Sequence, residues 1–154
     1  MKSMARASAP AKVILLGEHF VVYGEPAIVL AIDIRATVTA EKRNDGKVLI
    51  ESRGIGASGF FVDDKFFPEM GGEEAKRKLE PLYVIVREIR ERTDFFEGIN
   101  LRIESPIPIA AGLGSSAAVS VASAAALCSL LNLSLIHISE PTRPRLISYA
   151  VFCL

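Results

Sequence analysis

Pro108-Ile109-Ala110-Ala111-Gly112-Leu113-Gly114-Ser115-Ser116-Ala117 joins an alternating, strand-like segment to a long segment rich in alanine. The stretch contains two glycines and two adjacent hydroxyls, and no charged side chain. Glycine lets a backbone approach a ligand closely, and the first N–H groups of a helix carry a partial positive charge that suits an anion. The stretch therefore predicts a phosphate-binding loop that runs directly into a helix.

The segments nearest the loop have clear periodicities. Residues 98–105 alternate between apolar and polar side chains, which is typical of a half-buried strand. Residues 115–131 are apolar nearly all round, which indicates a buried helix. Residues 73–93 carry an apolar stripe at helical spacing. Pro81 should kink this helix or lie in the first turn of a new one.

The first half of the chain is mostly strand-like. Residues 4–8 suit an edge strand, and the continuous apolar run 13–16 suits a buried strand. Residues 27–40 are rich in β-branched side chains, with Asp33 at an expected bend.

A turn signal follows. Asn44-Asp45-Gly46 predicts a hairpin with residues 47–52 as the returning strand. Residues 54–72 are rich in glycine and should form one short strand and loops. Because the strands are mostly grouped ahead of the helices, the expected fold class is α+β.

Composition excludes several classes of function. Half of the 154 residues are hydrophobic, and 18 basic residues balance 18 acidic ones, so no basic patch for a nucleic acid is expected. Cys128 and Cys153 have no metal-like spacing, which favours a reducing compartment. With no signal-peptide pattern and no apolar stretch long enough for a membrane span, we expect a cytoplasmic protein that binds no membrane.

Two common phosphate loops do not fit residues 108–117. A Walker A loop needs a lysine that reaches the β- and γ-phosphates, and the stretch has none. Gly112, Gly114 and Ala117 match the dinucleotide pattern G-x-G-x-x-[GA] formally. However, Pro106 and Pro108 separate the strand from the glycines, and no acidic residue follows at ribose-binding distance before residue 133.

The pattern Pro-x-x-x-Gly-Leu-Gly-Ser-Ser-Ala at residues 108–117 resembles the signature of the GHMP kinases. A second motif, Ala9-Pro10-Ala11-Lys12-Val13-Ile14-Leu15-Leu16-Gly17-Glu18-His19 followed by Val21-Val22-Tyr23-Gly24, is similar to the N-terminal motif of the mevalonate kinases within that family. The resemblance covers residues 4–132. It implies an incomplete GHMP N-terminal ATP-binding domain, with a fold like domain 2 of ribosomal protein S5 and a left-handed crossover.

The resemblance also implies an activity. The parent enzyme would use ATP and Mg²⁺ to phosphorylate mevalonate to 5-phosphomevalonate, a step of isoprenoid biosynthesis and lipid metabolism. The small molecule mevalonate is then its partner, and a homodimer is left open. Two alternatives also remain open. One is another GHMP small-molecule kinase, acting on phosphomevalonate, homoserine or galactose, and the other is a non-catalytic nucleotide-binding domain.

Site residues follow by matching the two motifs. Lys12 is expected near the transferred phosphoryl group and the substrate, with Glu18 and His19 in the substrate pocket, and Ser116 facing Mg²⁺. Each assignment has a plainer alternative. Lys12 could simply extend to solvent, Glu18 and His19 could form a turn, and the hydroxyls of Ser115 and Ser116 could cap the helix. The ATP-binding residues would be Pro108, Ile109, Ala110, Ala111, Gly112, Leu113, Gly114, Ser115, Ser116 and Ala117.

Some parts of the kinase are expected to be missing. The family's catalytic aspartate and its acidic Mg²⁺ ligand come after the glycine-rich helix, so none of the earlier aspartates of this chain matches them, and the C-terminal GHMP domain is absent. Residues 133–154 resemble the conceptual translation of a sequencing-library adapter, and we interpret them as an artefactual tail without functional weight. We therefore expect the 154-residue chain to be inactive as a kinase.

Overall fold

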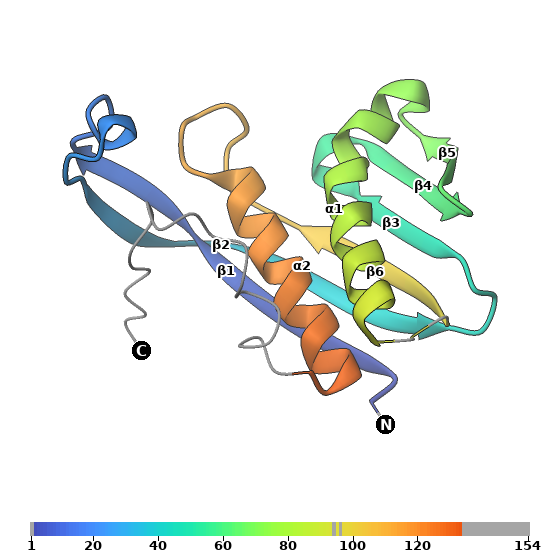
Figure 1. Ribbon diagram of the computed structural model, residues 1–154. Helices are drawn as coiled ribbons and strands as arrows, with labels where there is room; N and C mark the ends of the chain where they lie inside the picture. Colours follow the sequence, from blue (N-terminus) through green and yellow to red (C-terminus); the bar gives the residue numbers. More distant parts are fainter. Residues whose placement is uncertain (1, 94, 96, 134–154) are drawn as a thin grey trace.

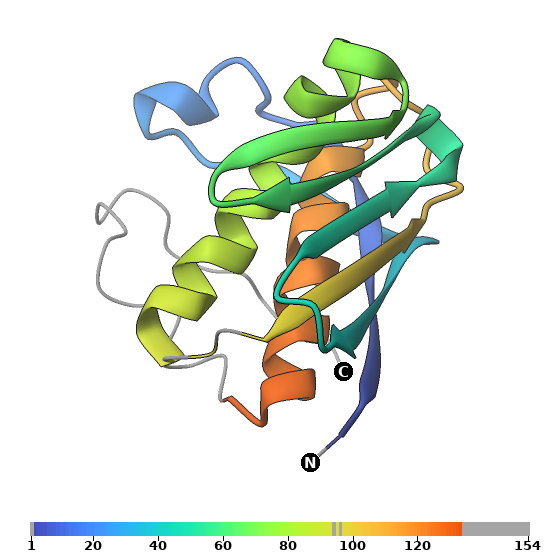
Figure 2. The ribbon, with the colours of Figure 1, turned by 90° about the vertical axis from the view of Figure 1, so that its right-hand side faces the viewer.

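The computed structural model describes residues 2–93, 95 and 97–133, so the tail from residue 134 onward lies outside the described residues. Six strands form one sheet, and two helices cover one of its faces (Figures 1 and 2). The α+β class is confirmed. None of the described helices is long and apolar enough to cross a membrane. The elements are β1 (Met4–Leu16), η1 (Val21–Tyr23), β2 (Ile28–Arg43), β3 (Val48–Ser52), η2 (Arg53–Ile55), β4 (Ala57–Val62), β5 (Lys65–Met70), α1 (Gly72–Thr93), β6 (Gly98–Glu104) and α2 (Ser115–Leu131).

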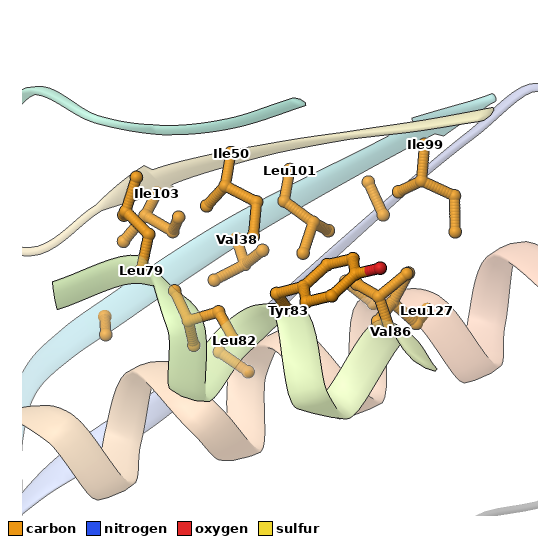
Figure 3. Close-up of a cluster of buried hydrophobic side chains, with 14 of the residues drawn as sticks. Val38, Ile50, Leu79, Leu82, Tyr83, Val86, Ile99, Leu101, Ile103 and Leu127 are labelled. Carbon is orange, nitrogen blue, oxygen red and sulfur yellow. The ribbon is translucent and has the colours of Figure 1, made fainter. Parts of the chain in front are cut away.

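The core lies between the sheet and the two helices. The predicted stripe of α1 is buried against the sheet, as is the apolar face of β6 (Figure 3). α1 continues through Pro81 as one helix, which excludes the second of the two expected outcomes, a new helix that begins at Pro81. Arg77, whose carbonyl Pro81 cannot bond, is exposed, so solvent can satisfy that carbonyl. The buried residues of this layer are Leu79, Leu82, Val86, Ile89, Ile99, Leu101 and Ile103.

Helix α2 has the predicted bounds but not the predicted burial. Ala118, Ala122 and Ala126 are buried against β1 and β2, whereas Val121 is 59% exposed. A helix on the outer layer of a two-layer fold can bury only the side that faces the sheet. The small side chains on that side allow α2 to pack closely onto the strands.

The predicted hairpin between β2 and β3 is wrong. The strand order is β1-β2-β6-β3-β4-β5, so β6 lies between the two strands, antiparallel to β2 and parallel to β3. The turn itself is present: Arg43 hydrogen-bonds Asp45 and lowers the pKa of that carboxyl to about 2. A turn signal describes only the local backbone, and it does not determine whether another strand enters between the two arms.

Gly98, the first residue of β6, lets that strand enter. A Cβ at this position would lie 2.8 Å from the Lys47 carbonyl oxygen and 2.8 Å from Asp45 Oδ1. The next residue, Ile99, donates its N–H to the same Lys47 carbonyl at 2.9 Å. Close approach of backbone to backbone therefore requires glycine here.

We expect Gly98→Ala to lower the free energy of unfolding by about 1–3 kcal/mol, because the Lys47 carbonyl must shift to make room. Gly54→Ala is the control, since a Cβ at Gly54 would meet only the Ser105 carbonyl oxygen, at an ordinary 3.7 Å. Urea unfolding of both variants measures the difference. Equal stabilities for the two variants would contradict this account of how β6 enters the sheet.

Residues 54–72 form more structure than expected. β4 and β5 make a hairpin whose two turn residues, Asp63 and Asp64, have φ values of +48° and +62°. Positive φ at both positions is the type I′ geometry that matches strand twist. The Tyr83 hydroxyl donates to Asp64 Oδ1 at 3.0 Å, and the Tyr83 ring stacks on Phe61 with centroids 4.2 Å apart. These contacts hold the hairpin against α1.

β1 is a continuous edge strand of 13 residues, and none of its last four residues, 13–16, is buried. The prediction of a buried strand at residues 13–16 was wrong, since Leu16 is 66% exposed. The 17 residues of α2 span roughly 26 Å, whereas 13 strand residues span roughly 43 Å, so one helix cannot cover the whole strand. Asp33 lies at the predicted bend, because the register shifts between the pairs Pro10–Arg35 and Ala11–Ile32.

Beyond this bulge, β1 and β2 continue as a two-stranded extension that ends in η1 (Figure 1). We call residues 13–31 the arm. Many of its apolar side chains are exposed: Leu15, Leu16, Phe20, Val21, Val22, Tyr23, Ile28, Val29 and Leu30.

Candidate active site

The predicted loop follows β6 and ends at the N-cap of α2. Gly112 and Gly114 have φ values of +73° and +72°, a region that glycine adopts without strain. The first bond of the helix runs from the Ala118 N–H to the Gly114 carbonyl, at 2.9 Å. The N–H groups of the three preceding residues, Ser115, Ser116 and Ala117, therefore have no partner within the helix and form its positive end.

The hydroxyls of Ser115 and Ser116 do not cap this helix. The N-cap is Gly114, which has no side chain, and no side chain bonds the first turn. The capping interpretation of the two serines is therefore wrong. Both hydroxyls belong to the first turn, beside the same unpaired N–H groups.

Lys12 lies directly against this loop, although it comes from β1 at the other end of the chain. Its backbone N–H donates to the Leu113 carbonyl at 2.9 Å. A Cβ at Gly114 would lie 2.9 Å from Lys12 Cγ and 3.2 Å from Lys12 Cε. The aliphatic stem of Lys12 thus occupies the space that any side chain at Gly114 would fill. The fold brings the two sequence motifs together at this point.

Glu18 and His19 lie at the tip of the arm, just before η1. Their side chains are 62% and 87% exposed, and His19 Nε2 lies 3.5 Å from Glu18 Oε1. Gly17 shapes this tip, because a Cβ there would lie 2.5 Å from the Pro26 carbonyl oxygen and its φ is +88°. Among the described residues, no hydrogen bond or ion pair joins Glu18 or His19 to Lys12 or to the loop. Both side chains are therefore open to solvent on the arm.

A cavity of about 880 Å³ lies between the loop, the start of α2, η2 and one face of α1. Its volume is within the range of about 300–1,000 Å³ that is usual for small-molecule sites. The loop residues predicted to bind ATP line it, apart from Ala117. The other lining residues are Ser52, Gly54, Ile55, Lys78, Pro81, Leu82, Ile103, Ser105, Ile107, Val119 and Ser120.

The walls of the cavity differ in character. The loop and the first turn of α2 contribute backbone N–H groups and hydroxyls, whereas Ile55, Leu82 and Ile103 form an apolar wall. Within the described part of the chain, Lys78 is the one charged residue in the lining, and its Nζ lies 3.0 Å from Glu74 Oε1. The hydrogen bond from Lys78 lowers the pKa of the Glu74 carboxyl. Such a cavity suits a ligand with an anionic end and an apolar end.

Sequence reasoning did not find the apolar wall or Lys78. These residues come from three separate segments that carry no recognisable motif. Lys78 also has the spacing of an ordinary surface pair, since Glu74 precedes it by one helical turn. The apolar wall and Lys78 come together only because α1 packs beside η2 and the loop.

Comparison with known proteins agrees with this geometry. Residues 80–149 match the family described as GHMP kinases N terminal domain, and that match includes the loop and α2. The mevalonate kinase of Pyrococcus abyssi is 44% identical over 138 residues, which cover 88% of this chain and 41% of that protein. The family match and this relative agree with the resemblance of the two sequence motifs to the GHMP kinases. The mevalonate kinase of Thermococcus onnurineus is 45% identical over 133 residues.

Solved structures of a mevalonate kinase and of a galactokinase share the fold of the chain. The mevalonate kinase of Methanococcus jannaschii superposes with a TM-score of 0.68 at 25% identity, covering 86% of this chain and 42% of that one. The galactokinase of Lactococcus lactis, complexed with galactose, superposes with a TM-score of 0.67 at 27% identity, covering 87% and 34%. The chain spans about two fifths of the length of the curated relatives it matches.

Proposed function

We propose that the chain is the nucleotide-binding part of a kinase that transfers the γ-phosphoryl group of ATP to the primary hydroxyl of mevalonate. The observation that carries the proposal is the contact of Lys12 with Gly114, which places a cation beside a glycine-rich loop and an open helix N-terminus. The choice of mevalonate rests on the names of the relatives at 44–45% identity. The galactokinase structure, at 27% identity, is a more distant relative with the same fold and galactose as its ligand.

The loop and the first turn of α2 are proposed to hold the phosphates of ATP. Phosphoryl transfer depends mainly on positioning and on stabilising charge on the transferred group. The N–H groups of Ser115, Ser116 and Ala117 provide fixed donors for phosphate oxygens. Gly112 and Gly114, which adopt a positive φ without strain, have no side chain that would keep a phosphate away from the loop backbone.

Lys12 is proposed to stabilise negative charge on the transferred group. The stem of Lys12 extends from β1 and packs against Gly114, so the ammonium group has fewer positions to sample before ATP binds. Its ammonium has three donors, which suit the oxygens of a phosphoryl group. Glu18 and His19 are exposed on the arm and are proposed to bind the polar groups of mevalonate.

The Ser116 hydroxyl is proposed to hold Mg²⁺ together with the phosphates. The ion would neutralise charge on the phosphate oxygens, and Mg²⁺ commonly keeps several waters beside one or two protein ligands. Among the described residues, no group of three or more His, Cys, Asp or Glu side chains could hold a metal by itself. A single hydroxyl beside bound phosphates fits this mode of binding. The Ser116 hydroxyl is available for it, because it makes no capping hydrogen bond at the start of α2.

We expect Lys12→Met to weaken binding of MgATP by the 154-residue chain about tenfold, because a charge-assisted contact to phosphate is lost while the apolar stem is kept. Lys65→Met, on the exposed edge strand β5, is the matched control and should bind as the unchanged chain does. Isothermal titration calorimetry measures both. Equal affinity for the two variants would remove Lys12 from the site.

The acceptor is tested separately by saturation-transfer NMR with mevalonate, galactose and homoserine. We expect a saturation-transfer signal from bound mevalonate. The signal should be weaker in the Glu18→Gln and His19→Ala variants. A saturation-transfer signal from galactose or homoserine, and none from mevalonate, would contradict the choice of mevalonate as the acceptor.

A further inference from the structure

Lys78 has a position in the cavity that the proposed phosphate site does not use. It belongs to α1, whose Pro81 and Leu82 line the same cavity one turn further along. The phosphate-binding groups belong instead to the loop and to α2. Because residues three and four apart share one face of a helix, Lys78 lies beside the apolar wall, which is the part of the cavity suited to a flat heterocycle.

We infer that Lys78, held by Glu74, donates a hydrogen bond to an acceptor atom of the nucleoside part of the bound nucleotide, and so positions the base against the apolar wall. This inference rests on the proposed function, because it requires a nucleotide in the cavity. Ring nitrogens of a purine and the oxygens of ribose are acceptors, and a lysine ammonium has only donors to offer.

Glu74 restricts where Lys78 can point. The Nζ–Oε1 distance of 3.0 Å joins neighbouring turns of α1, and the Lys78 side chain is 38% exposed. The carboxylate leaves other N–H donors of the ammonium free. It also balances the charge of Lys78, so the pair adds little attraction for the phosphates. Lys78 is thus a positioning residue for the nucleoside.

The test compares three ligands: ATP, AMP and inorganic tripolyphosphate. We expect Lys78→Met to weaken binding of ATP and AMP by the same factor, about fivefold, and to leave tripolyphosphate unchanged. Lys76→Met is the matched control, because Lys76 is exposed on the same helix, does not line the cavity and points about 160° away from Lys78. Glu74→Gln should also weaken binding of ATP and AMP and leave tripolyphosphate unchanged, with a smaller loss of affinity than Lys78→Met.

Three results would overturn the inference: a loss for ATP without an equal loss for AMP, a loss for tripolyphosphate, or no change with any ligand. The first two would place Lys78 at the phosphates, and the third would leave it as a surface residue. Thermal melts of each variant check that the fold is kept. If the unchanged chain binds neither ATP nor AMP, the proposed function itself fails, and the inference fails with it.

Discussion

Gly114→Ala should weaken ATP binding by about tenfold or more while lowering the free energy of unfolding by only about 1–2 kcal/mol. The stability cost arises because Gly114 has φ of +72°, where an L side chain is strained. The loss of affinity has another cause. The new Cβ would lie 2.9 Å from Lys12 Cγ, so the lysine stem must leave the loop. The phosphate site then loses the arrangement that places its cation beside the helix N-terminus.

Gly46→Ala separates these two causes. Gly46 has nearly the same φ, +70°, but a Cβ there would have no neighbour within 4 Å, and the residue belongs to the β2–β3 turn. We expect a similar loss of stability and unchanged ATP binding. Calorimetry and urea unfolding of both variants complete the comparison. Affinities that fall equally in the two variants would mean that strain or partial unfolding, and not displacement of Lys12, weakens the site.

Leu79→Ala should have the largest effect on stability, about 2–5 kcal/mol, because it removes a fully buried side chain and leaves a cavity between α1 and the sheet. That loss is large beside the roughly 5–15 kcal/mol that stabilises a typical domain. Leu79 is next to Lys78 on the helix, so loosening α1 should also disturb the wall of the nucleotide cavity.

Val84→Ala is the control for Leu79→Ala, because Val84 belongs to the same helix but is 37% exposed. We expect it to lower the free energy of unfolding by less than about 1 kcal/mol. Urea unfolding followed by circular dichroism measures both variants. Similar losses would mean that α1 is held by its own helical propensity and not by packing of Leu79 on the sheet.

Local patterns in the sequence predicted the local structure well. The loop at residues 108–114, the bounds of α2 and the buried stripe of α1 follow from glycine content, alternation and helical spacing. These signals act over a few residues, so one sequence contains them completely. The bend at Asp33 was also predicted, because an acidic residue interrupts an otherwise β-branched strand.

Features that depend on distant segments were not predicted. The turn at residues 44–46 suggests a hairpin, but the glycine that admits β6 into it is Gly98, some fifty residues later. The apolar run 13–16 resembles a core strand because periodicity does not report which strand a helix covers. In the candidate site, the nearness of Lys12 to the loop was expected only from family resemblance, and Lys78 was not expected at all.

The most direct test of the central claim is an amide NMR titration of the 154-residue chain with MgATP. The claim is that β1 and the glycine-rich loop form one phosphate site through the contact of Lys12 with Gly114. We predict that the resonances of Lys12, Gly112, Gly114, Ser115 and Ser116 shift together along one binding curve, while that of Gly46 stays in place. Shifts of the loop without Lys12, or no shifts in either segment at saturating MgATP, would contradict the claim.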